Sequence, residues 1–195
     1  MPDTPPFPLT LDGSSVLHQM CRFDWAGWRR ADAPARECAI AEVSALLAPL
    51  EKGSPSGHPN QSAVFAQLGH KGDLLFVHYR DTVEELARIE RDLARTEFGS
   101  WLQPVHSYLS IVELGLYESS SKLYAQLAAE GVEPYSEAWD KRVQETVDRQ
   151  ATAMSSRLYP SIPEAKYLCF YPMDKKRGEH VNWYSTPMPD RARSR

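Results

Sequence analysis

A short stretch near the end of the sequence gathers side chains that could bind or oxidise a ligand. They are a phenol, a thioether, three cations and an indole, contributed by Tyr171, Met173, Lys175, Lys176, Arg177 and Trp183. Cations hold acid groups, whereas the phenol, thioether and indole offer polarisable or redox-capable contacts. The mixture therefore suits a flat aromatic cofactor that carries carboxylates. The alternative interpretation is a solvated turn, because Lys-Lys-Arg-Gly after a strand ending at Pro172 is also typical of an exposed loop.

The composition limits the kinds of function that these residues can serve. A chain of 195 residues with 42% hydrophobic content can bury one good core, with an appended subdomain at most. A net charge of −4 and a pI of 5.9 give no general attraction to a nucleic-acid backbone or an anionic membrane. We therefore expect no nucleic-acid partner, and any cationic site has to be local.

The cysteines and the apolar runs indicate a compartment. Cys21, Cys38 and Cys169 are odd in number and form no Cys-x-x-Cys pair, which favours a reducing compartment and hence the cytoplasm. No apolar run approaches the roughly 20 residues needed to span a bilayer, so we expect no membrane segment. Residues 1–14 are proline-rich and lack the pattern of a signal peptide, and we expect a disordered tail there.

Apolar spacing predicts one βαββαβ unit over residues 15–116. The predicted elements are a strand over 15–23, helical structure over 25–50 divided near Pro34, strands over 61–68 and 73–79, a helix over 81–96 and a strand over 105–116. Gly69 and Gly72 favour a hairpin between the middle strands. Asp24 is a predicted cap for the first helical segment, and Asp81 with Glu84 resembles a capping box for the later helix.

This order of elements is that of a ferredoxin-like α+β fold, with an antiparallel sheet and both helices on one face. The opposite face of the sheet then needs a cover. In a dimeric α+β barrel the cover is a second copy of the sheet, supplied by a partner chain or by a repeat within the chain.

The remaining residues predict a helical insertion or linker over 117–160 and the start of a second ferredoxin-like domain over 161–195. Helices are predicted over 121–130 and after Pro134. The second carries an apolar stripe that favours packing over cofactor binding, formed by Trp139, Val143, Val147, Ala151, Met154 and Leu158. A strand over 166–171 would deliver the chemical motif at its C-terminal end.

The sequence resembles the coproheme decarboxylase branch of the chlorite dismutase superfamily. The run Tyr-Pro-Met-Asp-Lys-Lys-Arg over 171–177, followed by Asn-Trp-Tyr over 182–184, is similar to that family's haem-pocket strand. Segments 24–28, 69–76 and 108–114 also resemble family segments and occur in the same order. The resemblance covers most of residues 15–184 outside the helical insertion.

This resemblance implies a bacterial haem-biosynthesis enzyme that forms a homo-oligomer, usually a pentamer. With hydrogen peroxide, such an enzyme decarboxylates two propionates of iron coproporphyrin III to vinyl groups and yields haem b, while the porphyrin iron supplies the redox chemistry. By position, Tyr171 corresponds to the tyrosine that removes a hydrogen from a propionate side chain, and Lys175 to the lysine that holds the reactive carboxylate. Arg157 would clamp a propionate, Met173 would contact the porphyrin edge, and Trp183 would line the propionate side or simply pack.

Each of these residues also has an ordinary structural interpretation. Tyr171 could be a buried, hydrogen-bonded phenol, Lys175 a solvated lysine in a turn, and Met173 a filler of a gap in the core. Arg157 could stabilise a helix end by its charge.

The sequence departs from the family at the iron ligand. The family's proximal histidine follows the segment that matches 188–195, so no metal ligand is predicted within this sequence, and the half of the barrel that would follow is also absent from it. The six histidines are interpreted as surface or hydrogen-bonding residues: His18, His58, His70, His78, His106 and His180. Two alternatives to the decarboxylase therefore remain, namely a non-catalytic porphyrin-binding or oligomerisation module and a chlorite dismutase-like haem enzyme.

Overall fold

The computed structural model describes the chain except residues 1–4, 6, 55–56, 70 and 194–195, so His70 and part of the predicted tail lie outside the described residues. The chain forms two compact units. The sheet unit comprises Gly13–Val112 and Ser156–Lys166. The helical unit comprises Met1–Asp12, Glu113–Ser155 and Tyr167–Arg195.

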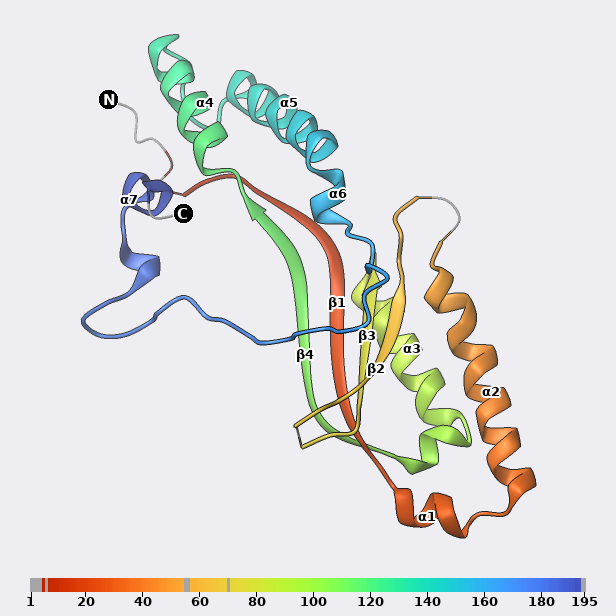
Figure 1. The fold of residues 1–195 in the computed structure, drawn as a ribbon. Helices are drawn as coiled ribbons and strands as arrows, with labels where there is room; N and C mark the ends of the chain where they lie inside the picture. The colour runs from red at the N-terminus through yellow and green to blue at the C-terminus, as the bar shows by residue number, and fades with distance from the viewer. Residues whose placement is uncertain (1–4, 6, 55–56, 70, 194–195) are drawn as a thin grey trace. The chain divides into compact units, whose positions relative to one another are not determined.

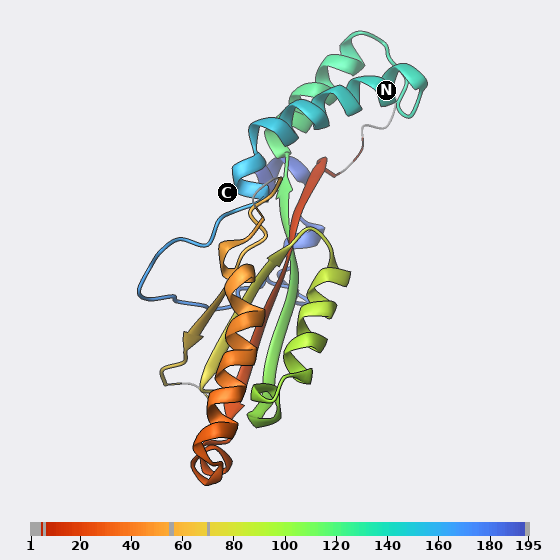
Figure 2. The ribbon, with the colours of Figure 1, turned by 90° about the vertical axis from the view of Figure 1, so that its right-hand side faces the viewer.

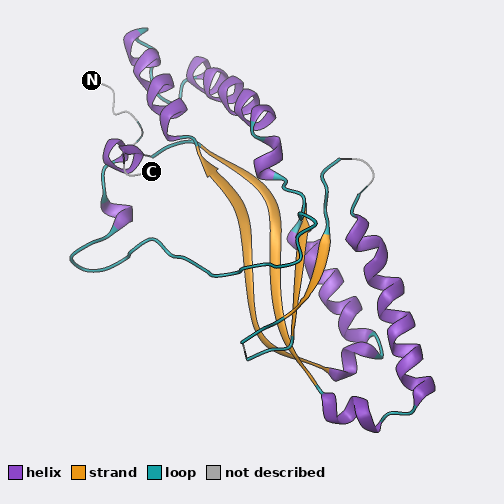
Figure 3. Cartoon of the chain, viewed as in Figure 1, coloured by secondary structure: helices purple, strands orange, loops and turns teal. Residues whose placement is uncertain are grey.

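The sheet has four strands in the order β2-β3-β1-β4 (Figures 1 and 3). The strands are β1 (Thr10–Phe23), β2 (Ser62–Ala66), β3 (Leu74–Arg80) and β4 (Leu102–Gly115), so that β1 begins within the predicted tail. β3 runs antiparallel to both β1 and β2. Phe76 of β3 pairs with Gln19 of β1 on one side and with Val64 of β2 on the other. This order and pairing confirm the predicted ferredoxin-like α+β fold.

Two long helices lie on one side of the sheet, as Figures 1 and 2 show. They are α2 (Ala33–Lys52) and α3 (Val83–Arg95), and the short helix α1 (Trp25–Arg30) precedes α2. The core between sheet and helices is built on Cys21 and Phe76 from the strands and on Val43 and Leu93 from the helices. Burial raises the pKa of the Cys21 thiol to about 11, with a further contribution from the charge of Glu90.

Side chains cap the helices of the sheet unit. The Asp24 carboxylate accepts a hydrogen bond of 2.8 Å from the Gly27 backbone, which confirms the predicted cap of α1. The capping box of α3 consists of Thr82 and Glu85, so the prediction for Asp81 and Glu84 was wrong by one position. Asp81 instead accepts hydrogen bonds from the side chains of Asn60 and His58, which lie before β2.

The helical unit pairs α4 (Tyr117–Ala129) with α5 (Glu137–Ala153). Their shared core contains Leu123, Tyr124, Leu127 and Trp139, and Val143 packs against it. The predicted packing role of the apolar stripe is thereby confirmed at Trp139 and Val143. The remaining short elements are the 3-10 helices η1 (Phe98–Trp101) and η2 (Trp183–Ser185), with α6 (Ser155–Leu158) and α7 (Met188–Arg193). No helix in the described part of the chain is both long and apolar enough to cross a membrane.

The strand predicted over 166–171 is absent from the structure, where these residues form a loop. A strand requires neighbouring backbone with which to exchange hydrogen bonds. Among the described residues after β4, the β-type pairing that occurs is a single bridge between Arg177 and Asn182. Apolar residues in the loop consequently stay in contact with solvent, and Tyr167 is 82% exposed.

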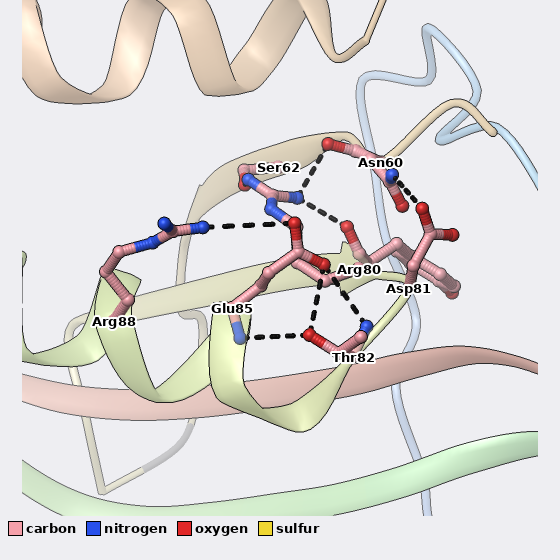
Figure 4. A network of polar contacts seen from close by, with 8 residues as sticks. Asn60, Ser62, Arg80, Asp81, Thr82, Glu85 and Arg88 are labelled. Carbon is pink, nitrogen blue, oxygen red and sulfur yellow. Dashed lines mark hydrogen bonds and ion pairs between the residues drawn. The ribbon is translucent and has the colours of Figure 1, made fainter. Parts of the chain in front are cut away.

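A buried arginine fixes the start of β2 to the end of β3 (Figure 4). Arg80 is only 5% exposed. Its guanidinium donates to the backbone carbonyls of Asn60, at 2.6 Å, Gln61, at 3.1 Å, and Tyr79, and to the Ser62 hydroxyl, at 2.9 Å. These acceptors compensate the burial of the Arg80 charge.

The Ser62 hydroxyl also contacts His78, which is 1% exposed. The hydroxyl oxygen accepts a hydrogen bond from Arg80 and lies 2.7 Å from His78 Nδ1. The other ring nitrogen, Nε2, is buried and has no hydrogen-bond partner among the described residues. Burial, and then the charges of Arg80 and His18, lower the pKa of His78 to about 4.

This histidine predicts a loss of stability in mild acid. Between pH 6.5 and about 4 the unfolded chain binds a proton that folded His78 does not, so the free energy of unfolding falls as the pH falls. The expected loss from His78 across this window is about 3 kcal/mol. Urea unfolding at several pH values should show a weaker pH dependence for His78→Asn than for the wild type. His106→Asn is the control, and an unchanged slope in His78→Asn would refute the assignment.

Candidate functional site

The chemical motif occupies residues 171–184 of the helical unit, and its second half is a hairpin. The backbone N–H of Trp183 donates to the Lys176 carbonyl at 2.9 Å, and that of Gly178 donates to the Val181 carbonyl at 2.9 Å. The Asn182 side chain accepts from the backbone of Tyr184 at 2.9 Å, which caps η2. The turn thus brings the cations before Gly178 opposite the aromatic residues after Val181.

Two cation–aromatic pairs cross this hairpin. Lys175 Nζ lies 4.6 Å from the centre of the Trp183 ring. Arg177 Cζ lies 4.3 Å from the centre of the Tyr184 ring, and a hydrogen bond with Tyr184 raises the pKa of Arg177. Exposed pairs of this type contribute about 0.5–1 kcal/mol each. The structure therefore brings Lys175 and Trp183 together as neighbours.

The other predicted site residues are exposed. Tyr171 is 63% exposed and Met173 is 81% exposed, so neither is the buried phenol or the core methionine of the structural alternatives. Arg157 lies exposed in the last turn of α6, within the sheet unit, where its charge also suits the helix end. Among the five predicted site residues, Lys175 and Trp183 are thus the pair for which the structure describes a direct contact.

The motif fits a flat carboxylated ligand by its donor set. Lys175 and Arg177 can each hold an acid group, and the solvent-facing Tyr171 and Met173 leave a phenol and a thioether available for contact. This surface is open, because its key side chains are mostly solvated within this chain. Among the described residues there is no group of three or more His, Cys, Asp or Glu side chains that could hold a metal ion.

Sequence reasoning missed the pairing of Arg177 with Tyr184. Both residues were part of the recognised motif, but neither was given a role of its own. The signal was present in Gly178 and Asn182, which bracket a short turn and imply that residues on either side face each other.

A second polar cluster lies in the sheet unit. His58 Nδ1 is 2.6 Å from Asp81 Oδ1, and the Asn60 amide donates to Asp81 Oδ2 at 2.8 Å. Burial acts to raise the pKa of Asp81, but these hydrogen bonds more than offset it and hold the pKa below its usual value. The His58 ring also stacks on Tyr159, with 3.3 Å between ring centres. The cluster thus ties three separate segments of the sheet unit together.

Comparisons with known proteins bear on both units. A protein of Halobacterium salinarum named "Putative heme-binding protein" is 34% identical over 193 residues, which are 98% of this chain and 35% of that protein. A solved structure described as a novel heme-binding protein from Thermus thermophilus is 31% identical, with a TM-score of 0.74, covering 99% of this chain and 66% of that one. The chain thus spans about a third of the first relative and just under two thirds of the second.

A structure of a mutant chlorite dismutase from Candidatus Nitrospira defluvii is more distant, at 18% identity and a TM-score of 0.46 over 62% of this chain and 50% of that one. That similarity is too low to support a conclusion. The decisive comparison is with the family model named chlorite dismutase, which matches residues 36–194. The match includes the β2–β3 hairpin, the helices α4 and α5 and the whole motif. With most of its length matched in this way, the chain belongs to the chlorite dismutase family.

Proposed function

We propose that this protein is a peroxide-dependent coproheme decarboxylase, which converts iron coproporphyrin III to haem b. The observation that carries the proposal is the motif hairpin, where Lys175 lies over Trp183 and Arg177 over Tyr184, with Tyr171 and Met173 exposed just before it. Membership of the family and two relatives described as heme-binding support a porphyrin ligand. The preference for coproporphyrin rests on the resemblance of residues 171–184 to the decarboxylase branch.

The reaction has a simple balance. Each propionate loses carbon dioxide and two hydrogen atoms to become a vinyl group, and these hydrogens reduce one hydrogen peroxide to two waters. When bound, the porphyrin iron would supply the redox chemistry that couples oxidation of the propionate to reduction of peroxide.

The residues of this chain would bind and orient the propionates. The Lys175 ammonium would hold the reacting carboxylate, and its neighbour Trp183 restricts where that ammonium can lie. Once oxidised to a phenoxyl radical at the expense of peroxide, the Tyr171 oxygen would take a hydrogen atom from the propionate side chain and so regain its O–H bond. Arg157, with a guanidinium fork suited to a carboxylate, is the proposed clamp for a second propionate, and Met173 the contact for the macrocycle.

The site is proposed to be completed in an assembly, for which we infer a homo-oligomer in the cytoplasm. The motif side chains are exposed in the single chain, and a cofactor site normally buries most of its ligand.

The test is an optical titration of the protein with iron coproporphyrin III, followed by hydrogen peroxide and separation of the porphyrin products. We expect a stoichiometric Soret shift and the appearance of haem b. Lys175→Met should weaken binding about tenfold, which equals about 1.4 kcal/mol. Lys166→Met, a change of the same kind outside the hairpin, should weaken it less than twofold.

Other results would identify the alternatives. Binding without conversion would indicate a non-catalytic porphyrin-binding module. Consumption of chlorite without porphyrin conversion would indicate a chlorite dismutase-like enzyme. The absence of a Soret shift would refute the proposed function for this chain.

A further inference from the structure

The helical unit contains a cavity of about 600 Å³ that lies outside the set of predicted site residues. One wall is α4, with Tyr124, Ala125 and Ala128. The facing wall is the segment that follows the hairpin, with Tyr184, Met188 and Arg191. The last residue of the motif, Tyr184, therefore forms part of a hollow that the sequence did not indicate.

The walls of this cavity are held by other contacts. Tyr124 is buried and stacks on Trp139, with 5.3 Å between ring centres and 17° between the ring planes. On the opposite side, Tyr184 is held by Arg177 over its ring and by the Asn182 cap at its backbone. Ala125 and Ala128 have short side chains on one face of α4, which leaves room for a flat or extended body to lie against the helix.

Among the described residues that line the cavity, one carries a charge. Arg191 is the charged member of the described lining, which holds no carboxylate. It is half-buried, its backbone N–H donates to the Pro187 carbonyl at 3.0 Å, and its guanidinium lies 5.9 Å from the centre of the Tyr117 ring. A guanidinium at the edge of an otherwise neutral, largely apolar cavity favours a ligand with an apolar body and an acid group.

We propose that this cavity binds an amphipathic carboxylate, with the apolar body between α4 and Tyr184 and the acid group at Arg191. Two sources share this chemistry, namely the propionate-bearing edge of a porphyrin and a fatty acid. The porphyrin source rests on the proposed function, because it makes the cavity an extension of the motif surface. The fatty-acid source is independent of that function.

The experiment uses decanoate, 1-decanol and iron coproporphyrin III as probes of the whole chain. Decanoate should shift the methyl NMR signals of Ala125 and Ala128 and bind with measurable affinity. Arg191→Gln should weaken decanoate binding at least about tenfold and leave 1-decanol binding within about twofold, since only the acid needs the guanidinium. Arg193→Gln is the matched control, because Arg193 lies on the same short helix and pairs with Asp190. Ala125→Phe, a change at an exposed position, should block both decanoate and 1-decanol by filling the cavity.

The outcomes separate this inference from the proposed function. If Arg191→Gln and Ala125→Phe weaken decanoate and iron coproporphyrin III alike, the porphyrin edge occupies the cavity. If they weaken only decanoate, the occupant is a fatty acid. A chain that binds decanoate in this way but gives no Soret shift refutes the proposed function and retains the cavity site. Decanoate binding that is absent, or indifferent to both substitutions, overturns the inference.

Discussion

Tyr171→Phe is expected to abolish the formation of haem b while leaving the affinity for iron coproporphyrin III within about twofold. The substitution removes one hydroxyl group from a side chain that is 63% exposed, so it disturbs no packing. It does remove the group proposed to take the hydrogen atom from the propionate. Because loss of a group that acts only in the reaction lowers turnover without lowering binding, the two measurements should separate.

Porphyrin product analysis after a fixed dose of peroxide measures this effect, with the Soret titration as the binding readout. Tyr167→Phe is the matched control, since Tyr167 is an even more exposed tyrosine of the same loop. We expect it to retain full conversion. Conversion by Tyr171→Phe at a rate near that of the wild type would remove Tyr171 from the proposed mechanism.

Arg80→Met is expected to lower the free energy of unfolding by about 3 kcal/mol. Methionine fills a similar volume but donates no hydrogen bond, so the carbonyls of Asn60 and Tyr79 and the Ser62 hydroxyl lose a charged donor. The Gln61 carbonyl is affected less, because it also accepts from the backbone of Tyr79 at 2.9 Å. An acceptor left unpaired in a buried place costs about 1–3 kcal/mol.

Urea unfolding followed by circular dichroism gives the comparison. The control is Arg88→Met on α3, where a 3.9 Å ion pair with Glu85 is well exposed and should contribute under about 1 kcal/mol. A stability of Arg80→Met equal to or above that of the wild type would mean that the cost of burying the guanidinium matches what its hydrogen bonds return.

The elements of the sheet unit could be predicted because their signals are local. The apolar spacing of α2 and α3, the Pro34 break and the glycines of the hairpin each act within a few residues. The strand over 166–171 could not be assigned in this way, because an apolar run becomes a strand only beside another strand. The capping box was misplaced by one residue since Asp81 and Thr82 are both good caps, and distant partners decided between them.

The candidate site was likewise predictable only where its signals are local. Residue types alone indicated an acid-binding, redox-capable motif, and the family match covers that motif. The partners of each cation, however, depend on the turn at Gly178, and the cavity beside Tyr184 depends on α4, more than fifty residues earlier in the chain. The burial of Arg80 also depends on distant residues, because the Asn60 and Gln61 carbonyls that accept from its guanidinium lie just before the neighbouring strand β2.

Gly13 at the start of the sheet unit carries a consequence for fragments of this protein. A Cβ at this position would lie 2.2 Å from the Leu158 carbonyl oxygen, so residue 13 has to remain glycine for the returning chain to pack there. Leu158 is itself buried, and Ile162 further anchors the return by donating its backbone N–H to the Gln61 side chain at 2.8 Å. A fragment that stops after β4 would therefore keep all four strands but lack the returning segment, which packs against Gly13 and binds Gln61. A self-contained version of the sheet unit therefore needs residues 156–166 as well as residues 13–112.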